Sequence, residues 1–192
     1  MSSPLRYFEL WDKMNVPGRW VLHQKDMDDH GRWVDPWQFQ RGTPLHLEGR
    51  PVLGISHAGV PLDFSLTELA TPVVTGRVVS LFEQLELGNE VQFIPALVEG
   101  QAEPYFILNV LHVIRCIDDA RCEEVGYWTP EDGIPELVGK YEKVRGLKVD
   151  PASMGDVSIC RPWGWTGAII ITERIKLAME RAGITGTRLR EA

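Results

Sequence analysis

The longest apolar stretch of the chain runs from Tyr105 to Asp119 and has an almost wholly apolar set of residues on one face. Only Asn109 and Arg115 interrupt the other face. A run this long, rich in β-branched residues and free of Gly and Pro, is typical of a central strand that is covered on both sides. We therefore predict one buried strand here, with His112 as a core histidine on its apolar face.

Shorter patterns before and after this stretch predict the neighbouring strands. Pro95 lies inside one of them, which predicts an edge or bulged strand, and a hairpin-length connection leads from that strand to the central one. The alternation of apolar and polar positions places these strands at residues 6–11, 19–24, 52–56, 91–98, 157–161, 168–171 and 187–191.

Two helices are predicted from apolar positions that recur at helical spacing. The first begins near Val78 and is expected to stop at Gly88-Asn89. The second follows Thr172, a suitable N-cap, and ends before Gly183, which suits the C′ position.

Strands followed by a helix that packs over them predict an α+β fold. We expect a mixed or antiparallel sheet packed by helices in residues 77–192, and a smaller β-rich subdomain in residues 1–76, where prolines divide the chain into short pieces. Residues 121–151 are charged and carry Gly and Pro, so they predict an excursion with short elements.

Charge narrows the choice of partner. The chain of 192 residues has a net charge of −7, and the stretch between Val78 and Gly139 contains twelve acidic residues but only two basic ones. Nucleic acids and anionic membranes require a basic footprint, so neither is an expected partner. The acidic stretch is interpreted either as a well-hydrated surface or as complementarity to a basic partner.

The cysteines and the N-terminus indicate the compartment. Cys116, Cys122 and Cys160 are an odd number without the spacing of a disulfide framework. No signal segment is present, and no apolar run approaches the ~20 residues needed to cross a bilayer. We therefore expect a cytoplasmic protein with reduced thiols.

Catalytic and metal-binding patterns are missing from the sequence, so we expect no cofactor and no metal. The five histidines are scattered, and the calcium-like string that begins at Asp26 has neither the Gly nor the Glu that such a loop needs. Cys122 lies among carboxylates, which raise the pKa of a thiol. A small enzyme that uses Cys122 or His30 is the alternative function, and a plain scaffold component is a third.

Aromatic residues in polar segments suggest a binding surface. Trp33 and Trp37 lie in a polar loop, and Trp163 and Trp165 flank a glycine turn. Such rings serve either as anchors for a protein partner or as lids that fold back onto the core.

Five short motifs follow one another from the predicted central strand to the C-terminus. The first is a Tyr-x-x-x-Asn-Val strand that ends near Cys-x-Asp, and here it comprises Tyr105, Asn109, Val110, Cys116 and Asp118. The others are an Asp-Pro, a strand that ends in Arg, an apolar strand that leads into a hydroxyl residue and Glu, and a Thr-Gly. Here they are Asp150-Pro151, Ile159–Arg161, Ile169–Glu173 and Thr185-Gly186.

In this order the motifs resemble those of the bacterial polymorphic-toxin immunity proteins of the Imm-eleven type. The resemblance covers roughly residues 77–192 and weakens in the first 76. Thr172 stands where the family usually has Ser, which keeps the hydroxyl, and Cys160 stands where a larger apolar residue is common.

The resemblance implies an antidote that binds one cognate secreted toxin and performs no reaction of its own. If the toxin is a nuclease, its active-site face is basic, and an acidic antidote can cover it. We expect no catalytic residues and leave the oligomeric state open. The candidate toxin-binding residues are Asp118, Asp119, Glu123, Glu124, Trp33 and Trp37.

Overall fold

The computed structural model describes residues 5–192 and places most strands in two sheets. In the first sheet β1 lies between β12 and β13, and only the pair β11–β8 is parallel. Its five strands, in spatial order, are β13 (Thr187–Glu191), β1 (Tyr7–Asp12), β12 (Ile170–Thr172), β11 (Ile159–Pro162) and β8 (Val113–Ile114).

The second sheet is also mixed, because β3 and β6 run parallel while its other pairs are antiparallel. Its six strands, in spatial order, are β2 (Val21–Asp28), β3 (Pro51–His57), β6 (Val91–Val98), β7 (Tyr105–Val110), β5 (Pro72–Thr75) and β4 (Phe64–Leu66).

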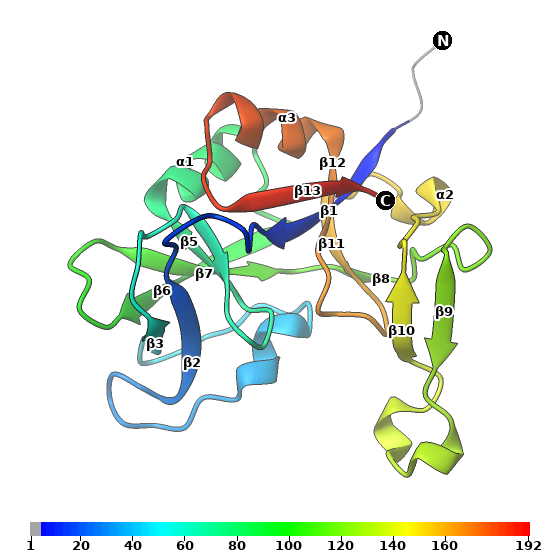
Figure 1. Ribbon diagram of the computed structural model, residues 1–192, viewed down its shortest axis with the longest axis horizontal. Coiled ribbons are helices and arrows are strands. Elements are labelled where there is room, and N and C mark those ends of the chain that lie inside the picture. Colours follow the sequence, from blue (N-terminus) through cyan, green and yellow to red (C-terminus); the bar gives the residue numbers. More distant parts are fainter. Residues whose placement is uncertain (1–4) are drawn as a thin grey trace.

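Two helices, α1 (Gly76–Gln84) and α3 (Glu173–Arg181), contact each other and lie side by side in Figure 1. Their apolar faces enter one core cluster together with strands of both sheets, which explains why each helix carries a single apolar stripe. The cluster includes Phe8, Val74, Val78, Phe82, Leu108, Ile171, Ile175 and Met179. The predicted α+β class with mixed sheets is thus confirmed.

The predicted central strand is wrong as a single element. It is divided at Leu111 and His112, where the chain leaves β7 of the six-stranded sheet and enters β8 of the five-stranded sheet. The N–H of Leu111 donates to the Glu90 carbonyl and the carbonyl of His112 accepts from the Arg161 N–H, so the crossing is held by backbone hydrogen bonds. His112 is half-buried in this crossing and does not lie on a buried strand face.

Most other strand predictions are confirmed to within a few residues, including β1, β3, β6, β11, β12 and β13. β6 is not an edge strand, because it lies between β3 and β7. Its proline is nevertheless tolerated, since β3 pairs only with Leu97 and Val98 while Pro95 is aligned with Phe106 of β7.

Strands from both sides of residue 76 share the two sheets. β1 pairs with β12 and β13, and β5 pairs with β7. The division of the chain into units of residues 1–76 and 77–192 stays a prediction.

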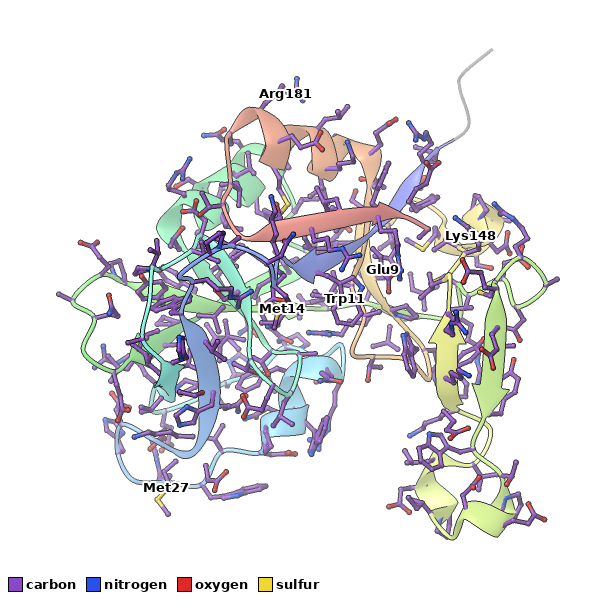
Figure 2. All side chains as sticks on the ribbon, viewed as in Figure 1. Glu9, Trp11, Met14, Met27, Lys148 and Arg181 are labelled. Atoms are coloured by element: carbon purple, nitrogen blue, oxygen red, sulfur yellow. The ribbon has the colours of Figure 1, made fainter. Side chains whose placement is uncertain are left out.

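The predicted excursion forms a hairpin of β9 (Glu124–Tyr127) and β10 (Tyr141–Arg145), which projects from the body of the molecule (Figure 1). We call residues 124–145 the arm. At its base the N–H of Asp118 donates to the Lys148 carbonyl (2.8 Å), and Lys148 Nζ donates to the carbonyl of Glu191 (3.2 Å), close to the end of β13 (Figure 2).

Short helical turns complete the structure. Two of them, η2 (Pro130–Asp132) and η3 (Pro135–Leu137), form the tip of the arm. The others are η1 (Pro36–Gln40) and α2 (Pro151–Met154). Within residues 5–192 no helix combines the length and the apolar character that spanning a membrane requires.

Candidate binding cleft

A cleft of about 820 Å³ lies between the arm and the body of the molecule. Three of the seven tryptophans line it. The body contributes Trp37, Gln40, Arg41, Val113, Trp163, Gly164 and Thr166, and the arm contributes Trp128, Glu136, Leu137, Lys140 and Tyr141.

The first wall is built on η1, whose start is fixed by Asp35 and Pro36. The Asp35 carboxylate accepts a hydrogen bond from the backbone N–H of Trp37 (3.0 Å), and a proline suits the first helical position. Phe39 of the same turn is fully buried and anchors it, whereas Trp37 is 53% exposed and lies along the cleft. The turn therefore presents an aromatic ring to solvent on a fixed backbone.

The second wall is the turn that follows β11. The Arg115 guanidinium carbon lies 3.3 Å from the centre of the Trp163 ring, a cation–π contact that holds the indole in place. Gly164 has a φ of +76° and accepts a hydrogen bond from the N–H of Tyr141 (3.2 Å), which joins the arm to the body. A side chain at Gly164 would strain this backbone and press on the Tyr141 ring at 3.3 Å.

Behind the cleft lies Arg161, which is fully buried although it carries a charge. Its Nη1 donates to the carbonyl of Thr166 (2.5 Å), and its Nε has no hydrogen-bond partner among residues 5–192. Thr166 lines the cleft and donates through its hydroxyl to Gln40 (3.0 Å). Burial lowers the pKa of Arg161 to about 10, so the guanidinium stays protonated at neutral pH.

The four predicted acidic contact residues gather at the base of the arm, outside the cleft. Asp119 accepts hydrogen bonds from the hydroxyls of Tyr127 and Tyr141, the latter at 2.6 Å. Asp118 lies 3.9 Å from Arg121, and Glu123 is exposed.

Glu124 is neutralised most completely of the four. It pairs with Lys143 at 2.5 Å and with Arg145 at 3.3 Å. The hydrogen bond from Lys143 and the charges of both bases lower the pKa of Glu124. The charge at the base of the arm is thus partly offset by residues of β10.

The structure separates the two tryptophans predicted as anchors. Trp33 is 69% exposed on the loop after β2, while Trp37 lines the cleft. Sequence reasoning did not select Trp128 or Lys140, and it named Arg161 only as the end of a motif strand and not as a residue of a binding site. No local signal marks these residues, because the cleft forms only when the arm lies against the body.

The two residues proposed for an enzyme, Cys122 and His30, make their contacts with different parts of the chain. Cys122 Sγ accepts from the backbone N–H of Lys148 (3.3 Å), whereas His30 lies beside Arg32 (3.0 Å). Burial raises the pKa of the Cys122 thiol, and the charges of Asp119 and Asp118 raise it further, as the sequence predicted.

A group of Asp28, Asp29 and His30 has the proximity of metal ligands, but its carboxylates are already occupied. Asp28 accepts hydrogen bonds from the backbone and side chain of Arg32. Asp29 accepts them from Arg50 in the same way. These arginines supply the positive charge that a cation would otherwise bring.

Comparison with known proteins gives the family of the chain, which the geometry of the cleft alone does not give. No curated protein matches the chain. The model of the Immunity protein family (Imm11) matches residues 4–192, so the similarity extends well beyond the C-terminal motifs and includes both walls of the cleft and the arm. The chain fits that family model over nearly its whole length. This protein, with its aromatic cleft beside a projecting hairpin, therefore belongs to the Imm11 immunity protein family.

Proposed function

We propose that the protein neutralises one cognate secreted toxin in the cytoplasm by binding it, and that the arm and the adjoining cleft form the contact surface. The observation that carries this proposal is an exposed, tryptophan-lined cleft next to a projecting hairpin in a member of an immunity family. Tryptophan is one of the residue types enriched among the few side chains that supply most of the affinity of a protein interface.

The tip of the arm supports a toxin with a basic active-site face, such as a nuclease. Residues 128–139 contain Glu131, Asp132 and Glu136 and no Lys or Arg, and all three acids are exposed. A narrow acidic hairpin can enter a cleft that is built to hold a phosphate backbone. Asp118, Asp119, Glu123 and Glu124 would extend the negative surface toward the base of the arm.

The direct test is co-expression of this chain with the polypeptide encoded by the neighbouring gene. We expect protection of the cells from that polypeptide and recovery of a stable complex. A neighbouring product that is toxic, yet is neither bound nor neutralised, would contradict the proposal.

A variant with a shortened arm makes the test specific for this surface. Residues 129–139 are replaced by Asn-Gly, a two-residue turn that joins antiparallel strands. Trp128 and Lys140, joined by a backbone hydrogen bond of 2.9 Å, then flank the new turn, so we expect β9 and β10 to stay paired. The variant should retain its circular dichroism spectrum and lose binding, whereas full binding by a folded variant would exclude the arm.

A further inference from the structure

The charge in the cleft has the opposite sign to that of the molecule. The chain has a net charge of −7, yet the cleft is lined by Arg41, which pairs with Asp35, and by Lys140 against a single acid, Glu136. Arg115 adds a cation on the Trp163 ring. A positively charged cleft on an acidic protein favours a ligand that carries negative charge.

Arg161 deepens this positive character from behind the wall. No carboxylate pairs with it within residues 5–192. Among the described residues, its guanidinium donates hydrogen bonds only to the carbonyls of Thr166 and, at 3.5 Å, of Ala70. A buried cation without a counter-ion is costly, and its field is screened less than that of a surface lysine. A carboxylate that entered the cleft near Thr166 would offset this cost.

The aromatic residues set the second requirement on the ligand. Trp37, Trp128, Tyr141 and Trp163 line the same cleft as Lys140. Lys140 makes no ion pair with any part of the chain from residue 5 onward, while Arg41 pairs with Asp35. Aromatic walls with a free ammonium group suit a ligand that combines an apolar side chain with an acid.

We infer that the cleft binds a segment of the partner protein that carries a carboxylate beside an aromatic or large apolar side chain. The identity of this partner as a toxin rests on the proposed function. The acidic tip and the basic cleft then form two contacts of opposite sign on neighbouring surfaces, and this pairing fixes the orientation of the partner.

The first test compares matched pairs of variants in binding to the co-purified partner. Trp37→Ala and Lys140→Glu alter the cleft, whereas Leu177→Ala removes an exposed apolar side chain on α3 and Lys13→Glu makes the same charge change at an exposed position outside the cleft. We expect each cleft variant to weaken binding about tenfold or more and each control to stay within about twofold. Equal effects within either pair would overturn the inference.

The second test needs no toxin. The indole N–H signals of the protein are followed by NMR during titration with the peptide Ac-Phe-Asp-Glu-NH2, and with Ac-Phe-Lys-Lys-NH2 as the opposite-charge control. We expect the signals of Trp37, Trp128 and Trp163 to shift with the acidic peptide only, and Lys140→Glu to abolish the shifts. Equal shifts with both peptides, or none at these indoles, would refute the acidic preference.

The two tests separate the inference from the proposed function. If no toxin binds the wild-type chain, the proposed function fails while the peptide titration still decides the chemistry of the cleft. If the toxin binds and the cleft variants match their controls, the proposed function stands and the inference fails.

Discussion

Two helix ends show what single residues contribute to the fold. After α3, the N–H of Gly183 donates to the Glu180 carbonyl and that of Ile184 to the Met179 carbonyl. This is a Schellman motif with glycine in the left-handed conformation (φ +62°). After α1 the same two bonds form, but the left-handed residue is Glu86 (φ +57°).

Glu86 therefore carries backbone strain that a glycine would relieve. We expect Glu86→Gly to raise the free energy of unfolding by roughly 0.5–1 kcal/mol, measured by urea denaturation. The matched control is Glu83→Gly, the same chemical change inside α1 at an exposed position, which should lower stability by about 1 kcal/mol. If both variants lost stability equally, the conformation of Glu86 would carry no strain.

The same two positions show how far the sequence predicts helix ends. The end at Gly183 was predicted correctly, because glycine in the C′ position is a recognisable signal. The end of α1 was placed at Gly88, although the helix stops at Gln84, since a glutamate gives no sign that it adopts φ > 0. Thr172 occupies the predicted N-cap position, but its hydroxyl makes no capping bond.

At the scale of elements, Asp63 connects three segments that are distant in sequence. Its carboxylate accepts hydrogen bonds from the hydroxyl of Thr75 (2.9 Å), from the N–H and hydroxyl of Thr185 (both 2.9 Å) and from Arg77 (2.6 Å). Burial alone would raise the pKa of Asp63, but the hydrogen bonds from Thr185 and Thr75 and the charge of Arg77 outweigh it. The pKa is therefore lower in the folded state.

The lowered pKa of Asp63 predicts how the stability provided by its carboxylate depends on pH. Because the folded pKa is depressed, the stabilisation is fully present above the ordinary aspartate pKa of about 4 and is lost as the pH falls through the folded value. Asp63→Asn should cost about 2 kcal/mol at neutral pH, and the difference from wild type should shrink near pH 3. Urea unfolding at both pH values measures this difference in the free energy of unfolding. A difference independent of pH would show that the charge of Asp63 is not involved.

Elements with one clear face were predictable, and elements defined by their partners were not. The alternation in β13 and the stripe of α3 follow directly from having one buried side. The crossing at Leu111 and His112 is invisible in the sequence, because both sheets bury apolar residues and no Gly or Pro marks the change. The arm has little burial on either face, so residues 121–151 offered no periodic pattern.

At the scale of the whole molecule, the fold distributes the acidic stretch over separate regions. Glu83 and Glu86 lie on or beside α1, Glu99 and Glu103 lie in the connection from β6 to β7, and the other acids after residue 117 lie on or near the arm (Figure 1). Glu99 is also paired with Lys25. The acidic residues that are close together in the sequence therefore do not form one continuous surface. The tip of the arm is the region where acidic residues occur without basic ones.

This distribution gives different roles to acids that look alike in the sequence. If the tip steers a basic toxin, Glu131→Lys should slow association several-fold at low salt, with a much smaller change in dissociation. Glu83→Lys on α1 makes the same change in net charge far from the arm and should leave association nearly unaltered. Stopped-flow binding at rising salt provides the measurement, since screening should bring the Glu131→Lys and wild-type rates together. Equal slowing by both substitutions would mean that the net charge of −7, and not the placement of acids on the arm, governs capture of the toxin.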